Sequence, residues 1–135
     1  MPVIYQKFIY REDLESNPDS MYLFGDNDKR TGYGGQAREM RGEQNAIGIR
    51  TKWIGSNSKA SFFSDKDFDF IAVMIEEDLE QAIAHLRAGG ILVIPLDGLG
   101  SGLSRLPEKA PRVNEFLEDR LEELERVTTI DWNKR

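Results

Sequence analysis

The sequence predicts an α/β fold, more closely a three-layer α/β/α sandwich with a mixed sheet. Two short apolar runs, residues 21–24 (MYLF) and 91–94 (ILVI), each lead into a glycine-rich loop and then into a helical pattern. A long amphipathic helix is expected between them, and this order of elements is typical of an α/β three-layer sandwich with a mixed sheet. The sequence contains no repeat and no linker, so we expect residues 1–135 to form one domain.

The N-terminal third of the chain favours short elements. Residues 2–10 are rich in β-branched and aromatic side chains and predict a strand, and residues 11–19 predict a turn or a short helix. Residues 21–24 predict a buried strand that stops at the loop of residues 25–35, which is rich in Asp, Asn and Gly. Good helix formers over residues 36–41 predict a short helix directly after this loop.

The middle of the chain contains the clearest helix. Residues 46–51 alternate as a strand does, and residues 55–60 read as a loop. A helix follows, which Ser64 or Asp65 can cap and which ends at the next glycine pair. Its apolar positions recur at three- and four-residue spacing: Phe68, Ile71, Ile75, Leu79, Ile83 and Leu86. Residues 91–94 lack polar alternation, as expected of a central strand that is covered on both faces.

The C-terminal part predicts one further helix and an edge strand. The helix is expected to start near Pro107, because proline is favoured in the first helical turn. Its expected buried residues are Ala110, Val113, Leu117, Leu121 and Leu124. Residues 128–132 could add a short strand at the edge of the sheet.

Composition excludes several classes of function. The formal net charge is -6, which argues against general binding to nucleic acids or anionic membranes. The chain has no Cys and one His, so disulfides, thiolate metal sites and His-based catalytic triads are not expected. No apolar stretch is long enough to span a bilayer, and the N-terminus does not resemble a signal peptide. We therefore expect a cytoplasmic protein without a membrane partner.

The first glycine-rich loop is a candidate anion site. Its glycines can bring backbone amides close to a phosphate, and a helix that begins near Gln36 would add its positive end. The glycines concerned are Gly32, Gly34 and Gly35. Asp26 and Asn27 stand at the exit of the preceding strand and could bind a sugar or a base edge. A hairpin whose glycines serve only turn geometry explains the same residues.

The second loop, residues 95–106 (PLDGLGSGLSRL), has the same placement between a strand and a helix. Its amides and hydroxyls could also cradle phosphate, so that two loops would hold a diphosphate from both sides. The candidate ligand-binding residues are Gly98, Gly100, Ser101, Gly102, Leu103 and Ser104. The plainer alternative is a connector between a strand and a helix.

Lys52 is the candidate catalytic cation. It stands at the end of a predicted strand and could contact phosphate or act as a nucleophile if burial lowers its pKa. A solvated edge lysine is the alternative, and a shift of one residue would turn the side chain to the other face of the sheet. Asp26 and Asp97, one in each loop, are candidate catalytic carboxylates. Four aromatic residues could stack on an adenine or fill the core: Tyr33, Trp53, Phe62 and Phe63.

These motifs, in this order, resemble a compact macro domain, the family that binds ADP-ribose and often removes it from modified targets. The resemblance covers roughly residues 20–125 and is carried by Gly-x-Gly-Gly-x-Ala at residues 32–37 and Pro-x-x-Gly-x-Gly-x-Gly-Leu at residues 95–103. The second loop is similar to that of the branch that hydrolyses terminal ADP-ribose. Residues 49–52 (IRTK) resemble the stretch that carries the catalytic lysine there, with one residue inserted. Residues 42–52 also resemble small macro-like proteins of bacteriophages.

The resemblance implies binding of ADP-ribose or a related NAD-derived nucleotide between the two loops and hydrolysis of an ADP-ribosyl linkage. Lys52 would act as nucleophile or electrostatic stabiliser, with no metal and no cofactor. The catalytic Asp of this branch is replaced by Ser104, so Asp97 or Asp26 would have to take its place. Nucleic acid is expected only as an ADP-ribosylated substrate. Two alternatives remain: a non-catalytic ADP-ribose-binding module, and a phage-type accessory protein that acts through protein–protein contacts.

Overall fold

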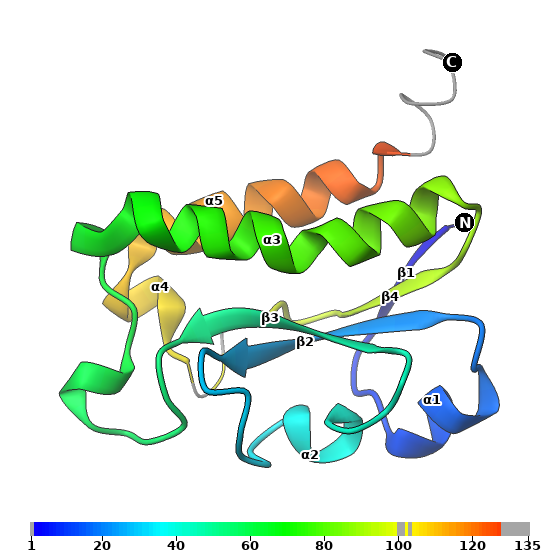
Figure 1. Cartoon of the computed structure of the whole chain (residues 1–135), viewed down its shortest axis with the longest axis horizontal. Coiled ribbons are helices and arrows are strands. Elements are labelled where there is room, and N and C mark those ends of the chain that lie inside the picture. Colours follow the sequence, from blue (N-terminus) through cyan, green and yellow to red (C-terminus); the bar gives the residue numbers. More distant parts are fainter. Residues whose placement is uncertain (1, 100–101, 103, 128–135) are drawn as a thin grey trace.

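A computed structural model describes residues 2–99, 102 and 104–127 and has an α/β fold (Figure 1). The strands are β1 (Val3–Gln6), β2 (Met21–Asn27), β3 (Ala46–Lys52) and β4 (Leu92–Pro95). The helices are α1 (Arg11–Ser16), α2 (Ala37–Met40), α3 (Phe68–Arg87), α4 (Leu106–Lys109) and α5 (Pro111–Leu124). Short 3₁₀ turns cover Lys59–Ser61 and Asp65–Asp67. The edge strand expected at residues 128–132 lies outside the described residues.

Among the described residues the sheet is parallel, whereas the sequence predicted a mixed one. Its strand order is β1-β4-β2-β3, and each pair of neighbouring strands runs in the same direction. Each connection between consecutive strands contains a helix: α1, α2 and α3 in turn. Such a connection carries the chain back to the end of the sheet where the previous strand began, which makes the next strand parallel.

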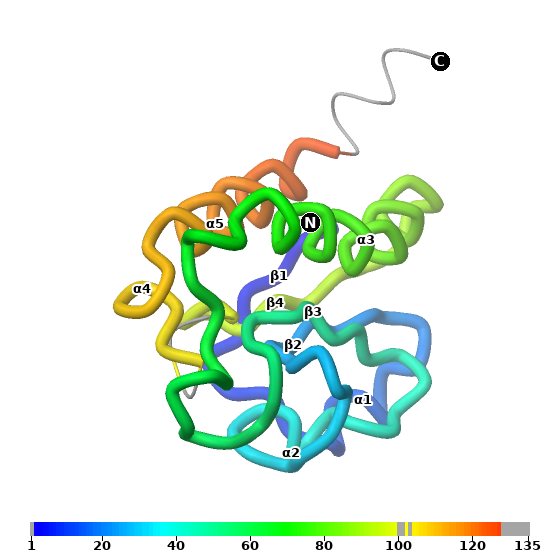
Figure 2. Tube along the Cα trace, turned by 60° about the vertical axis from the view of Figure 1, so that its left-hand side comes forward, coloured from blue at the N-terminus to red at the C-terminus, as the bar shows by residue number. Residues whose placement is uncertain are grey.

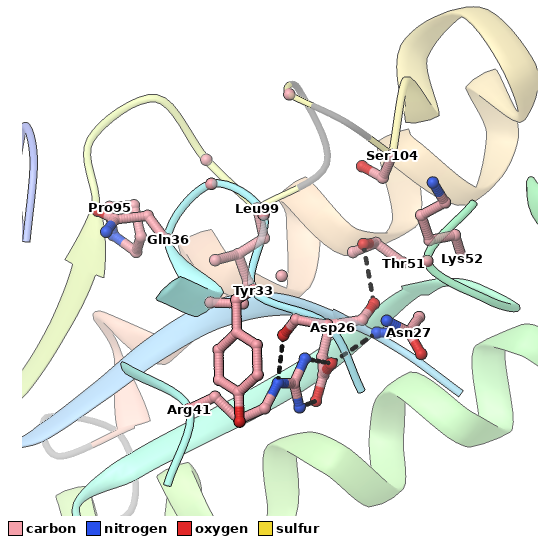
Figure 3. Close-up of a pocket in the computed structure, with 18 of the residues that line it drawn as sticks. Asp26, Asn27, Tyr33, Gln36, Arg41, Thr51, Lys52, Pro95, Leu99 and Ser104 are labelled. Atoms are coloured by element: carbon pink, nitrogen blue, oxygen red, sulfur yellow. Dashed lines mark hydrogen bonds and ion pairs between the residues drawn. The ribbon is translucent and has the colours of Figure 1, made fainter. Parts of the chain in front are cut away.

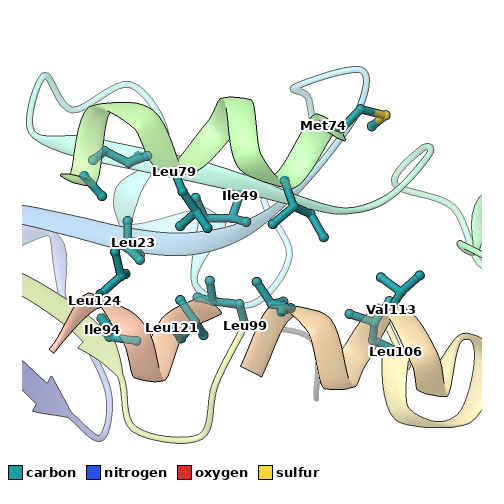
Figure 4. Close-up of a cluster of buried hydrophobic side chains, with 14 of the residues drawn as sticks. Leu23, Ile49, Met74, Leu79, Ile94, Leu99, Leu106, Val113, Leu121 and Leu124 are labelled. Carbon is teal, nitrogen blue, oxygen red and sulfur yellow. The ribbon is translucent and has the colours of Figure 1, made fainter. Parts of the chain in front are cut away.

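Helices cover both faces of this sheet. Figures 1 and 2 show α3 and α5 on one face and α1 and α2 on the other. Successive side chains of a strand point to opposite faces, so Leu23 packs beneath α3 and α5, whereas Tyr22 and Phe24 pack with α1 and α2. Figure 4 shows the larger core, in which Leu79 of α3 meets Ile49 of β3. All four residues of β4 are buried, as expected of a central strand, but the strand is shifted by one residue from the predicted 91–94 and Ile91 is exposed.

Strand β2 does not stop at Gly25 as expected but continues to Asn27. Gly25 pairs in register with Ile49 of β3, and the backbone of Leu99 lies directly over it. A Cβ at Gly25 would overlap the Leu99 carbonyl oxygen. Glycine at this position therefore allows the second loop to lie on the strand, rather than ending the strand.

The C-terminal helix is divided into α4 and α5, where the sequence predicted one helix. The break lies at Ala110, whose φ of -149° and ψ of 70° are not helical. The next residue is Pro111, and a proline disfavours helical geometry in the residue before it. The predicted buried positions of this region are buried: Ala110, Val113, Leu117, Leu121 and Leu124.

The remaining boundaries differ from the prediction by a few residues. The first strand ends at Gln6, four residues earlier than expected. The long helix begins at Phe68 after a 3₁₀ turn, and it gives way to Gly89, whose φ of 89° suits glycine alone. Throughout the described part of the chain, no helix is both long enough and apolar enough to cross a bilayer.

Candidate functional site

A cavity of about 430 Å³ lies at the carboxyl ends of β2, β3 and β4, where both glycine-rich loops meet (Figure 3). In parallel sheets this edge is where ligands bind. The sequence-predicted site residues that line the cavity are Asp26, Asn27, Gly32, Gly34, Gly35, Gln36, Lys52, Asp97, Gly98, Gly102 and Ser104. Gly100, Ser101 and Leu103 lie outside the described residues. The fold thus brings the two predicted loops and the predicted lysine to one cavity.

The first loop presents a run of backbone amides. Gly32 has a φ of 96° and Gly35 a φ of 56°, a region that side chains rarely adopt. Among the described residues, none accepts a hydrogen bond from the backbone N–H groups of residues 32–36. Helix α2 has only four residues, so the expected helix dipole contributes little and the loop amides themselves are the available donors.

Asp26 is tied to two arginines. It is 5% exposed, and its carboxylate accepts hydrogen bonds from Arg41 at 2.5 and 3.3 Å and from Arg30 at 3.3 Å. Arg41 also donates to the carbonyl oxygens of Gly32 and Thr31, at 2.7 and 3.2 Å. Asp26 therefore holds the first loop through Arg41 (Figure 3), and both of its carboxylate oxygens already have partners.

The side chains of Asn27 and Gln36 also bind backbone rather than point unpaired into the cavity. Asn27 donates to the Thr31 carbonyl at 2.7 Å and accepts from the Lys29 amide at 3.0 Å. Gln36 exchanges two hydrogen bonds of 2.8 Å with the backbone of Ile9. These two residues line the cavity and also fix its walls through these backbone contacts.

A β-bulge directs Lys52 toward the cavity. Asp26 pairs with Arg50 but Asn27 pairs with Lys52, so β3 carries one extra residue, Thr51, at this point. Bulges alter the alternation of side chains between the two faces. Thr51 and Lys52 consequently both line the cavity, and the Thr51 hydroxyl donates to the Asp26 carbonyl at 3.2 Å.

The Lys52 ammonium is buried and held by a serine-rich turn. Lys52 is 6% exposed, and Nζ donates to the Ser56 carbonyl at 2.8 Å. The Ser56 hydroxyl is hydrogen-bonded to those of Ser58 and Ser61, and Ser61 is fully buried. Burial lowers the pKa of Lys52 below its ordinary value.

The second loop forms the opposite wall. Gly98 has a φ of 87°, and the exposed Asp97 beside it lines the cavity. Ser104 is 6% exposed, and Figure 3 shows it at the same end of the cavity as Lys52. In the described residues of this loop, Asp97 is the one carboxylate that reaches the cavity.

Two aromatic side chains border the cavity. Tyr33 is 67% exposed and lines it, and Phe8 lines it from the segment after β1. The other aromatic candidates from the sequence do not line the cavity. Trp53 lies edge-on to Phe63, with ring centroids 4.8 Å apart, and the buried Phe62 ring contacts the Lys52 ammonium. Of the four predicted stacking residues, only Tyr33 is placed to meet a ligand in this cavity.

Residues 4–120 match a family of unknown function, DUF7831. The chain belongs to this family. Searches among curated proteins and among solved structures gave no match. The segment that matches DUF7831 contains every residue that lines the cavity.

Several cavity residues of this DUF7831 member were missed by the sequence analysis. Arg41, Thr51, Lys7 and Phe8 all line the cavity. Arg41 lies at the end of a predicted short helix, and nothing local marks it as the partner of a carboxylate 15 residues earlier. The inserted residue in the IRTK stretch was the one available signal for the bulge at Thr51.

An ion-pair network anchors the loop between β2 and α2 to α3. Asp78 of α3 is 8% exposed and binds Arg30 at 2.7 Å and Arg50 at 3.0 Å. These contacts raise the pKa of Arg50, chiefly through its hydrogen bond to Asp78. Arg30 itself has a φ of 57°, which is uncommon for a residue with a side chain.

In the part of the chain that the structure describes, no cluster of three potential metal ligands occurs.

Proposed function

We propose that this chain binds ADP-ribose or a related NAD-derived nucleotide between its two glycine-rich loops and hydrolyses an ADP-ribosyl linkage. One observation carries the proposal: a single cavity is lined by both loops and by a buried lysine. The resemblance to macro domains supports it, and so does the placement of helices on both faces of the sheet, which fits a macro-like three-layer sandwich. The proposal places this activity in the cytoplasm.

The residues divide the work as follows. Amides of residues 32–36 and of the second loop would donate hydrogen bonds to the diphosphate, and Tyr33 would stack on the base. Lys52 would approach the linkage to be cleaved, where its buried position strengthens its interaction with developing negative charge. Asp97, which lines the cavity from the second loop, would act as a base.

The second candidate function is a non-catalytic ADP-ribose-binding module. Ser104 stands where the hydrolysing macro domains have an Asp, and the Lys52 ammonium is engaged by the Ser56 carbonyl. Both observations favour binding without turnover. The third possibility, a phage-type accessory protein, needs neither loop to bind a nucleotide.

Isothermal titration with ADP-ribose, and with AMP and NAD as comparators, tests the ligand class. We expect micromolar binding that falls at least tenfold in Gly32→Ala, because the new side chain strains the loop that donates the amides. Gly42→Ala is the matched control, since Gly32 and Gly42 both have a φ of 96° and open space at the Cβ, but Gly42 does not line the cavity. Both changes should cost a similar ~1–2 kcal/mol of stability.

A turnover assay on ADP-ribosylated protein then separates enzyme from binder. Loss of hydrolysis in Lys52→Ala, with ADP-ribose binding retained, supports the enzyme. Binding without turnover by the wild type supports the module. Absence of binding by all three nucleotides contradicts both and leaves the accessory protein.

A further inference from the structure

Three cationic side chains gather round the ring of Phe62, and one of them, Lys52, lines the cavity. The distances to the ring centroid are 4.7 Å from Lys52 Nζ, 5.0 Å from Lys109 Nζ and 5.8 Å from Arg105 Cζ. Phe62 is 7% exposed, so the ring is a fixed platform. Because an aromatic ring has two faces, at least two of the three cations must lie over the same face of Phe62.

The positive charge of this cluster is only partly balanced. Arg105 and Lys109 both lie near Glu108, at 3.0 and 3.9 Å. Among the described residues, no carboxylate pairs with Lys52, whose ammonium donates to the Ser56 carbonyl. One carboxylate against three cations leaves an excess of two positive charges, in a chain whose net charge is -6. This concentration of charge favours a compact anion.

Arg105 and Lys109 reach the Phe62 ring from the start and the end of α4. Arg105 has a φ of 48°, a left-handed conformation that is unfavourable for a residue with a side chain. Its carbonyl accepts from the Glu108 and Lys109 amides, at 3.2 and 2.9 Å, which makes it the N-terminal boundary of α4. Arg105 and Lys109 are therefore one turn apart and on one side of α4.

The cluster adjoins the cavity without forming its diphosphate-binding walls. Lys52 lines the cavity and belongs to the cluster, and Ser104, which directly precedes Arg105, also lines the cavity. The glycine loop of residues 32–35 enters the cavity from β2 instead, and Figure 3 shows its Tyr33 apart from Lys52 and Ser104. An anion held by Arg105 and Lys109 would therefore lie beyond the part of a nucleotide that the amides of residues 32–36 hold.

The geometry points to a phosphate-binding subsite formed by Lys52, Arg105 and Lys109 round Phe62, which accepts a phosphate monoester on the leaving-group side of the substrate. This inference deepens the proposed function. The position of the phosphate on the leaving-group side rests on that function, whereas the affinity of the cluster for phosphate does not rest on it. A dianion matches the excess charge of the cluster, whereas a long polyanion would need a basic surface that an acidic chain does not offer.

Titration of the ¹⁵N-labelled protein with phenyl phosphate, followed by NMR, tests the subsite. We expect saturable shifts of the Arg105 Nε–H signal and of the Lys109 amide, with affinity reduced at least tenfold in Arg105→Gln/Lys109→Gln. Lys29→Gln/Arg38→Gln is the matched control, because it removes the same charge from two exposed residues outside the cavity. The control should bind like the wild type. Lys109→Gln alone should weaken binding if the double variant does not fold.

Three results would overturn the subsite: no saturable shift with phenyl phosphate, equal weakening in the test and control variants, or tighter binding of a single-stranded oligonucleotide that both variants weaken alike. The last would indicate a diffuse polyanion surface. Titration of the same samples with ADP-ribose, followed at residues 32–35, separates the two proposals. If phenyl phosphate binds but ADP-ribose, AMP and NAD all fail to bind, the proposed function is overturned but the phosphate subsite is not.

Discussion

At the scale of single residues, the carboxylate of Asp26 shows how a buried charge is accommodated. It accepts hydrogen bonds from Arg41 and Arg30, and its neighbour Gly48 has no side chain because a Cβ there would collide with this carboxylate. Arg41 is 15% exposed in its side chain, so the pair is shielded from solvent. A buried pair of this kind is costly to break, because the remaining partner keeps its desolvation penalty.

Replacement of Arg41 by Gln should lower the free energy of unfolding by about 3 kcal/mol, at the low end for such pairs because Arg30 remains. Urea denaturation measures this change in the free energy of unfolding. Arg38→Gln, at an exposed neighbouring position, should change stability by less than about 0.5 kcal/mol. The double variant Arg41→Gln/Asp26→Asn should regain part of the loss. Equal effects of Arg41→Gln and Arg38→Gln would contradict the role given to this pair.

The buried Lys52 should make the free energy of unfolding depend on pH. Its pKa in the folded protein lies below the ordinary value of 10.5 because of burial. Between these two pKa values the unfolded chain binds more protons, so stability should rise with pH in that window. Lys52→Met removes this contribution. The stability of Lys52→Met relative to the wild type should therefore be greatest near neutral pH and decline toward pH 10.5, as urea midpoints at several pH values would reveal. A pH-independent difference would show that the lysine is not desolvated.

At the scale of elements, the contact between β2 and the second loop sets the shape of the cavity. Gly25→Ala should destabilise the protein by roughly 1–3 kcal/mol, since its Cβ would meet the Leu99 carbonyl oxygen. Gly102→Ala is the control, because a Cβ there meets no atom within 4 Å and φ lies outside the left-handed region. Thermal unfolding of the two variants checks the difference. A Gly25→Ala protein as stable as the control would mean that the loop does not rest on the strand.

Local sequence patterns predict some features of the helices and strands but not others. The apolar spacing of α3 predicted the burial of Ile71, Ile75, Leu79 and Leu86, whereas Phe68 and Ile83 are only partly buried. The break at Ala110 was predictable from Pro111 but was overlooked. The bulge at Thr51 was not predictable in the same way, because it depends on the register between two strands that are 25 residues apart.

At the scale of the whole molecule, the sequence predicted the α/β class and the residues that gather at one cavity. It did not predict the parallel direction of each strand, the order of the strands, or the partners of Asp26, Asn27 and Gln36. Strand direction, strand order and these hydrogen-bond partners all depend on contacts between segments that are distant in the sequence. The glycines stand out in the sequence because their backbone chemistry is local, whereas the hydrogen-bond partners of Asn27 and Gln36 are set by the segments around them.

The strand order also has a consequence for synthesis. Strand β1 is the first to leave the ribosome, yet its one neighbour in the described sheet is β4, which is 89 residues later from Val3 to Leu92. Lys7 and Phe8, which follow β1, supply one wall of the cavity. That wall cannot be fixed until β4 has been translated and inserted between β1 and β2. A nascent chain therefore acquires its cavity late, after most of the DUF7831 region has been made.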